Sequence, residues 1–230
     1  MSVVRGSLFA MTIALLVQTG SSAGQSIPSP YRFIDEKQTV GAFASYILTA
    51  RGTVGLGPED GAAAGVRYSI RLSGPFNVEA ETFYFPSTRP VRDTTLAGDE
   101  REQVGTADLT LLGGIASLRF NLTGPRTWHK LQPFVAFGVG AVLDLSGTSV
   151  EDERVPADVR FDFGTSFAAH VGGGIEWFPG NRLSLRLDAR NQLWKTNTPF
   201  PFLVGEAGVQ TPEDEWIQNG VISLGFAVRF

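Results

Sequence analysis

Charged side chains recur at every second position in several stretches of this sequence. Glu79 and Glu81 form one such group, and Arg186, Asp188 and Arg190 form another. Residues two apart in an extended chain lie on the same face of a strand, so each group places its charges on one side. Charges confined away from bulk water must be paired, because a lone buried charge is expensive. The spacing predicts an ion-paired network, and the alternative is a path for ions or solutes along these charges.

Hydrolytic chemistry would need a nucleophile beside a base and an acid. The base would have to be His170, since His129 falls in a predicted turn. The next residue on the same face as His170 is Gly172, so we expect no hydroxyl beside the imidazole. The sequence therefore does not predict an enzyme.

The composition excludes several other chemistries. The 230 residues include no Cys and two His, which argues against disulfides, thiol catalysis and Cys-ligated metals. A formal charge of −4 argues against nucleic acid as a partner. The acidic stretches 151–153 and 213–215 lack the ligand spacing of a calcium loop, and no predicted helix follows the glycines at 172–174 as a phosphate loop requires. No cofactor or metal is expected.

The N-terminus has the pattern of a secretory signal peptide. Arg5 precedes an apolar run at 8–17, and small residues around Ala23 suit cleavage after that position. The run is too short to cross a bilayer, which takes roughly 20 apolar residues. We assign 1–23 to a cleaved signal peptide.

Beyond the signal peptide, alternating side-chain character predicts β-strands. In one strand, Leu183, Leu185 and Leu187 alternate with polar residues. Within another, the apolar phase changes near Gly113 and Gly114, which suggests a β-bulge. The predicted strands are 40–50, 62–72, 76–84, 107–122, 133–145, 161–178, 183–190 and 222–230.

The predicted connections alternate between short and long, which is typical of outer-membrane barrels with short periplasmic turns and long extracellular loops. The tight turns are 73–75 and 179–181, the connection 123–132 is moderate, and the long, polar ones are 51–60, 86–105, 146–160 and 195–215. The clearer strands have one fully apolar face, as contact with outer-membrane lipid demands, whereas a soluble ligand-binding barrel needs the reverse. Four aromatic residues near the strand ends are predicted to form interfacial girdles: Phe76, Tyr84, Trp177 and Trp216.

An eight-stranded barrel is wide enough only for its own side chains, so the inward charges are predicted to fill the lumen. The predicted network contains Arg67, Arg71, Glu79, Glu81, Arg119, Glu176, Arg186, Asp188 and Arg190. A three-residue turn at 73–75 would place Arg67 opposite Glu81 and Arg71 opposite Asn77. A three-residue turn at 179–181 would place Gly174 opposite Arg186, Gly172 opposite Asp188 and His170 opposite Arg190, with the glycines leaving room for the long side chains.

The signal peptide, the eight amphipathic strands, the loop pattern and the C-terminal sequence from Ser223 to Phe230 resemble the eight-stranded outer-membrane barrels of the outer membrane protein A and W type. The resemblance implies a closed, antiparallel, up-and-down transmembrane barrel over 40–230. A periplasmic lead-in would occupy 24–39, without an appended periplasmic domain. The resemblance also assigns Phe226, Val228 and Phe230 to recognition by the barrel-assembly machinery.

These observations together predict a monomeric protein of the cell outer membrane. Its expected role is structural or surface-interacting, with a side-chain-filled lumen. The alternatives are a narrow passive channel for small or hydrophobic solutes and, less favoured, a lipid-modifying enzyme of the outer membrane.

Overall fold

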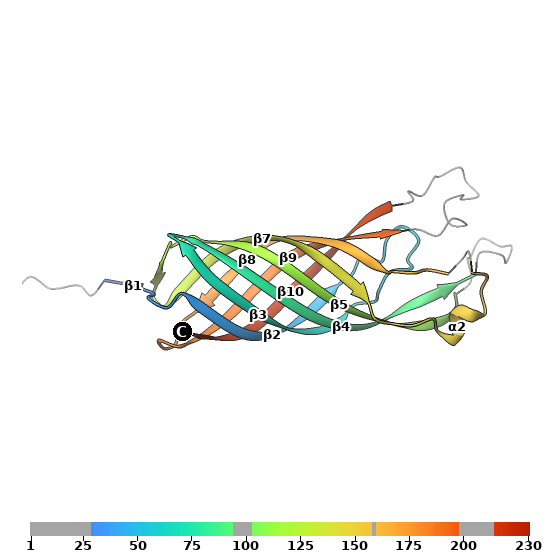
Figure 1. The fold of residues 1–230 in the computed structure, drawn as a ribbon, viewed down its shortest axis with the longest axis horizontal. Coiled ribbons are helices and arrows are strands. Elements are labelled where there is room, and N and C mark those ends of the chain that lie inside the picture. The colour runs from blue at the N-terminus through green and yellow to red at the C-terminus, as the bar shows by residue number, and fades with distance from the viewer. Residues whose placement is uncertain (1–28, 94–102, 158–159, 198–213) are drawn as a thin grey trace, which may run out of the picture.

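The computed structural model describes residues 29–93, 103–157, 160–197 and 214–230, and the predicted signal peptide lies outside them. Eight long antiparallel strands in this part of the chain close into a barrel (Figure 1). They are β2 (Gln38–Leu48), β3 (Gly61–Ser73), β4 (Phe76–Arg92), β5 (Gln103–Asn121), β7 (Leu131–Asp144), β8 (Thr165–Trp177), β9 (Leu183–Asn197) and β10 (Asp214–Arg229). Pairing of β10 with β2 completes the circle, so the predicted closed up-and-down barrel is confirmed. No helix among the described residues is long and apolar enough to cross a membrane.

The two ends of the barrel differ in their connections. The left end in Figure 1 holds the C-terminus and the three shorter connections, at 74–75, 122–130 and 178–182. The other end holds the longer connections and α2 (Val150–Glu153). We call these the turn end and the loop end.

A small second ladder lies at the turn end. Strand β1 (Tyr31–Phe33) pairs antiparallel with β6 (Arg126–Trp128), which lies within the connection from β5 to β7. Part of the predicted lead-in at 24–39 is therefore held as a strand beneath the barrel. Its last residues, from Gln38, already belong to β2.

The outward side chains near the turn end are apolar and exposed. On β10, for example, Ile222 is 55% exposed and Leu224 is 63% exposed. A closed barrel satisfies its backbone hydrogen bonds internally, and an apolar outer band is what contact with hydrocarbon requires. This band has the character of a lipid-facing surface, and we call it the lipid-facing band.

The interior has two layers with different chemistry. Along β4, the inward residues Asn77, Glu79 and Glu81 are followed toward the loop end by Phe83 and Phe85. The polar layer thus lies nearer the turn end, and the apolar layer lies nearer the loop end. The apolar layer contains Phe43, Ile47, Leu56, Ala63, Phe83, Phe85, Leu109, Leu111, Ile115, Val142, Phe161, Phe163, Ala168, Trp194 and Val221.

The predicted bulge at Gly113 and Gly114 is wrong. Both residues pair in unbroken register with β4 on one side and β7 on the other. The apolar side chains change face because the surroundings change. Leu111 points inward into the apolar layer, whereas Leu118 points outward from the polar layer.

Two of the long connections are shorter than predicted, whereas those around 51–60 and 146–160 are slightly longer. Strands β4 and β5 together cover much of the predicted loop 86–105, and β9 and β10 extend into the predicted loop 195–215. In these extensions the inward face combines apolar residues such as Val91 with the buried Arg89, and several outward side chains are polar, such as Thr88 and Asp108. The barrel wall therefore continues beyond its lipid-facing band.

Candidate functional site

The polar layer of the lumen is the candidate site, and its strands place eight charged side chains in one connected cluster. We call it the charge network: Arg67, Glu79, Glu81, Arg119, Glu176, Arg186, Asp188 and Arg190. It holds four arginines and four carboxylates, so its formal charge is zero. All eight belong to the predicted set.

The β3–β4 hairpin has the predicted register, with Arg67 opposite Glu81 and Arg71 opposite Asn77. Arg67 donates to Glu81 Oε2 through Nε at 3.0 Å and Nη2 at 2.9 Å. Its Nη1 also lies 3.7 Å from Asp188 across the lumen. Glu81 is shared, because Arg190 donates to its other oxygen.

The predicted register of the β8–β9 hairpin is wrong by two residues. Arg186 lies opposite Glu176, Asp188 opposite Gly174, Arg190 opposite Gly172, and His170 opposite Gln192. The last pair between β8 and β9 is Trp177 with Leu185. Leu183 and Ser184, the first residues of β9, pair with β10 and not with β8, and this moves the pairing by two residues. A shift of two keeps every side chain on its face, so the inward set is unchanged.

Glycine still makes room for the long side chains, as predicted, but with different partners. A Cβ on Gly172 would lie 2.4 Å from the Cβ of Arg190, and one on Gly174 would lie 2.7 Å from the Cβ of Asp188. At these two pairs, β9 supplies the charged side chain and β8 supplies the glycine that leaves room for it.

Glu79 lies at the centre of the charge network. Arg186 Nη1 donates to both of its oxygens, at 2.8 and 2.9 Å, and Arg119 Nη1 donates at 3.3 Å. Only 3% of the residue is exposed. One carboxylate thus balances two arginines from different strands.

Neutral groups complete the charge network, and the sequence reasoning did not identify them. Asn121 and Gln132 accept hydrogen bonds from Arg119, at 2.7 and 3.2 Å. The ring of Phe134 has the guanidinium carbons of Arg119 and Arg186 each 4.1 Å from its centroid. Phe134 shares the inward face of its strand with small residues, and that alternation was the available signal.

Arg71, the ninth predicted member, is not part of the charge network. Its guanidinium donates to the carbonyl oxygen of Ile34 at the turn end. It therefore ties the segment before β2 to the barrel mouth.

A serine and a histidine meet in the lumen, contrary to the prediction that no hydroxyl lies beside His170. Its Nε2 lies 2.8 Å from Ser117 Oγ, and both residues are buried. They reach each other across β7 because Gly138 lies between them: a Cβ there would be 2.4 Å from Ser117 Oγ. The contact spans three strands, so the sequence around His170 alone could not reveal it.

The charge network leaves little free space. A cavity of about 30 Å³ lies beside Arg67, Glu79 and Arg119, which suffices for one or two water molecules. Among the described residues, no group of three or more His, Asp and Glu side chains is arranged to hold a metal ion. What this arrangement does chemically is to fill the lumen with mutually neutralised charges.

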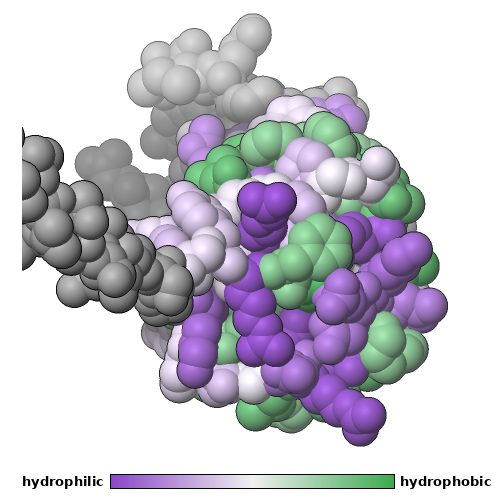
Figure 2. Space-filling model, turned by 90° about the vertical axis from the view of Figure 1, so that its left-hand side faces the viewer, coloured by the Kyte–Doolittle hydropathy of each residue, from purple (hydrophilic) through white to green (hydrophobic). Residues whose placement is uncertain are grey.

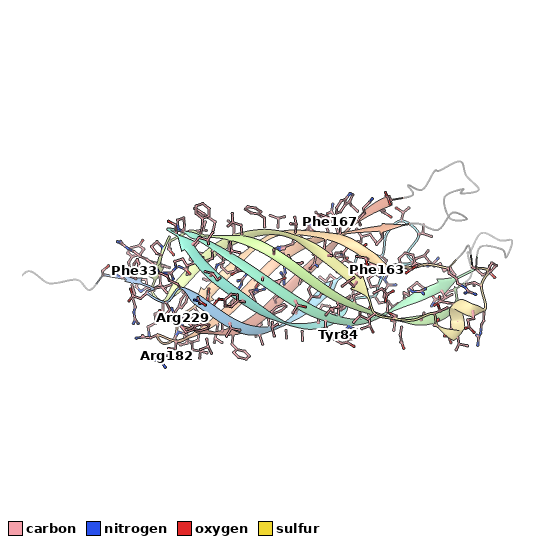
Figure 3. All side chains as sticks on the ribbon, in the orientation of Figure 1. Phe33, Tyr84, Phe163, Phe167, Arg182 and Arg229 are labelled. Carbon is pink, nitrogen blue, oxygen red and sulfur yellow. The ribbon has the colours of Figure 1, made fainter. Side chains whose placement is uncertain are left out.

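The apolar layer closes the lumen above the charge network. Trp194 is fully buried, with its ring centroid 6.3 Å from that of Phe85 and 5.9 Å from that of Phe163. Figure 3 labels Phe163 toward the loop end and Arg229 toward the turn end. The barrel axis is therefore blocked by a charged layer and then by an aromatic one.

The residues predicted to face the membrane all lie on the outer surface. Phe76 and Trp177 are exposed near the turn end, and Trp216 is exposed toward the loop end, where its ring packs edge-on against Phe167. Tyr84 is also exposed, but β4 continues beyond it to Arg92, so it does not end its strand as predicted. It lies where the outward face changes from apolar to polar. The predicted assembly-signal residues Phe226, Val228 and Phe230 project outward at the turn end.

An ion pair anchors the loop that contains α2 to the barrel wall. Arg89 Nη2 donates to both oxygens of Asp152, each at 2.8 Å, and both residues are buried. Ser149 is the N-cap of α2, and its backbone N–H and hydroxyl donate to the carboxylate of Asp152. Burial alone would raise the pKa of Asp152, but the hydrogen bonds from Ser149 and Arg89 outweigh it and hold the pKa below its usual value.

Asp152→Asn is expected to loosen this loop, because Arg89 would lose a charged acceptor worth about 1.5–3 kcal/mol. Limited proteolysis at neutral pH should cut between 145 and 164 faster than in the wild type. Glu153→Gln, on the exposed side of α2, is the matched control and should cut at the wild-type rate. The pKa of Asp152 is lower in the folded protein than its ordinary value of 3.8. The contribution of Asp152 to stability is therefore complete at pH values above 3.8 and is lost as the pH falls through the pKa of the folded protein. Equal cutting of both variants would contradict the anchoring role.

Comparison with known proteins places the fold. No known protein family and no curated protein matches the sequence. The crystal structure of Neisserial surface protein A has a TM-score of 0.52 at 14% identity, over 84% of this chain and 97% of that one. Outer membrane protein W of E. coli gives 0.49 at 11% identity over 85% and 98%, and the N-terminal β-barrel domain of Pseudomonas aeruginosa OprF gives 0.45 at 11% over 85% and 99%.

The likeness to Neisserial surface protein A covers nearly the whole of that protein and has the same strand architecture. Together with the closed barrel and its apolar outer band, it defines the class. The chain has the fold of the eight-stranded outer-membrane β-barrels.

Proposed function

We propose that this protein is a structural or surface-interacting barrel of the outer membrane with a permanently closed lumen. The observation that carries the proposal is the filling of the lumen by two successive layers. The charge network pairs equal numbers of arginines and carboxylates, and the apolar layer around Trp194 lies next to it toward the loop end. An eight-stranded barrel is wide enough for such filling but not for a free channel beside it.

The proposed orientation places the turn end in the periplasm and the loop end outside the cell. Short periplasmic turns and long outer loops are the general pattern of such barrels. The barrel wall continues beyond the lipid-facing band at the loop end, and its inner side is packed with apolar residues such as Phe85 and Leu109. The outer loops would thus stand on a rigid base suited to contact with other surfaces.

The remaining expectations belong to the same proposal. The chain would reach the outer membrane through a cleaved signal peptide and act as a monomer in lipid. Phe226, Val228 and Phe230 would be read by the barrel-assembly machinery, and their outward position leaves them accessible for this. An enzymatic role is not proposed, because Ser117 and His170 meet inside the filled lumen, where a lipid substrate has no access.

Planar-bilayer recording of the refolded mature chain tests the closed lumen. We expect no steady openings in 1 M KCl, because the charged and aromatic layers leave room for isolated water molecules only. A wide porin added to the same bilayer serves as the positive control. Steady, voltage-independent openings would contradict the proposal and favour the passive channel.

A further inference from the structure

A cavity of about 90 Å³ opens at the turn end, three times the volume of the one beside the charge network. Its walls come from β1 and the segment after it, from the β5–β7 and β8–β9 connections, and from the end of β10. The charged side chains in the wall are Arg32, Asp35, Glu36, Lys130 and Arg229. These groups come together only because β1 folds beneath the barrel mouth.

Arg229 forms the inner wall of the cavity and is 95% buried, with 5% of its surface exposed. Its Nη2 donates to the Gly180 carbonyl at 2.9 Å, and its guanidinium lies 4.5 Å from the ring centroid of Phe178. The Nη1 contact with Glu36 is longer, at 3.5 Å. The Nε–H is buried without a hydrogen-bond partner among the described residues. A buried donor without a partner calls for an explanation, and a guanidinium group forms its strongest hydrogen bonds with phosphate or carboxylate anions.

The surface around the cavity is strongly basic. Exposed cations occupy β1, β6 and the turns, and Figure 2 shows hydrophilic residues over most of this end. They are Arg32, Lys37, Arg126, Lys130 and Arg182, against Asp35 and the half-buried Glu36. The described loop-end segments mix exposed acids, among them Asp60, Glu153 and Asp162, with the exposed cations Arg51 and Arg154. A basic rim at a membrane surface attracts phosphate-bearing headgroups.

The wall of the cavity itself is zwitterionic. Arg32, Lys130 and Arg229 can donate to a phosphate, for which guanidinium groups are well shaped. Asp35 and Glu36 in the same wall would repel a purely anionic headgroup and attract an ammonium group. The complementary ligand therefore carries a phosphate and an ammonium a few atoms apart.

The apolar surroundings favour a lipid over a free solute. Phe33 lines the cavity and is 54% exposed, and Tyr31 and Trp128 on the same small ladder are about half exposed. Exposed aromatic side chains of this kind lie at the level of lipid headgroups. We propose that this cavity binds the phosphoethanolamine headgroup of a phospholipid in the inner leaflet, with its acyl chains along the outer wall of the barrel. The choice of leaflet rests on the proposed orientation.

Lipid retention by the refolded mature chain in neutral detergent tests this site independently of conductance. Native mass spectrometry would compare short-chain phosphatidylethanolamine with phosphatidylglycerol of the same chain length, and with inorganic phosphate and phosphoethanolamine. We expect phosphatidylethanolamine to bind most tightly. Removing two exposed wall cations, in Arg32→Gln/Lys130→Gln, should weaken binding about a hundredfold, since each charged hydrogen bond is worth roughly a factor of ten.

The matched control is Arg126→Gln/Arg182→Gln, which removes two equally exposed cations from the same end that do not line the cavity. It should retain the wild-type affinity within about twofold. Asp35→Asn should abolish the preference for phosphatidylethanolamine over phosphatidylglycerol. Equal weakening by both double variants would reduce the site to diffuse surface charge and overturn the proposal. Equal affinity for inorganic phosphate would overturn the lipid assignment.

Discussion

Glu79→Gln is expected to lower the free energy of unfolding of the refolded barrel by on the order of 3–5 kcal/mol. Gln keeps the size of the side chain but removes the charge that balances Arg119 and Arg186. Both arginines are buried, so each keeps its desolvation cost after its carboxylate is lost. Urea unfolding in lipid vesicles, followed by tryptophan fluorescence, measures the change.

The control for this variant also removes one of the two arginines that the substitution leaves without a carboxylate partner. Glu79→Gln/Arg186→Gln should be less destabilised than the sum of the two single variants, because residues in one network are coupled. Glu153→Gln, an exposed acid on α2, should unfold like the wild type. If the two lumen substitutions simply add, Glu79 and Arg186 do not share a network, and the neutral charge layer is not what fills the lumen.

Trp194→Ala should cost about 3–5 kcal/mol, the range for deleting a fully buried large aromatic side chain. The side chain lies between Phe85 and Phe163 in the aromatic layer, and its loss would leave a cavity that strands cannot close without breaking their ladders. Trp194→Phe is the matched control. It keeps a ring in place and removes an indole N–H that has no hydrogen-bond partner among the described residues, so it should lose much less.

Trp194→Ala also distinguishes the contributions of the two lumen layers to blocking ions in bilayer recordings. Trp194→Ala opens the aromatic layer but leaves the charge network intact, so its conductance should stay at the wild-type level. Steady openings in this variant would show that the charge network alone does not block ions. Unchanged stability would show that the aromatic layer contributes nothing to the fold.

The sequence alone determined which side chains face the lumen in the membrane-spanning part. The period of a strand is two, so the alternation of Leu183, Leu185 and Leu187 with Arg186 and its neighbours assigns the faces without knowledge of any contact. A register error of two residues left this assignment intact. Eight of the nine predicted lumen charges accordingly lie in one cluster.

The sequence determined the pairing register of a hairpin only where a tight turn fixes which residues lie opposite each other. The turn around Gly74 is tight, and Gly74 has the positive φ of 54° that such a turn demands, so the pairing of Arg67 with Glu81 follows from counting. In the β8–β9 hairpin, Leu183 and Ser184 pair with β10 only, and the backbone N–H of Phe178 donates to the Lys130 carbonyl in another connection. A contact between two connections far apart in the chain leaves no pattern in the local sequence from which it could be predicted.

Only the tertiary structure decided where the environment of the strands changes. The apolar residues of β4 and β5 exchange faces where the barrel leaves its lipid-facing band, because the interior there is an apolar core and the exterior is aqueous. In the sequence, a change of the apolar face within one strand has the same pattern as a β-bulge, which is why the sequence predicts a bulge at Gly113. The contact of Ser117 with His170 across Gly138, and the assembly of Arg32, Lys130 and Arg229 around one cavity, were likewise set by closure, since these residues come from strands and connections far apart in the chain.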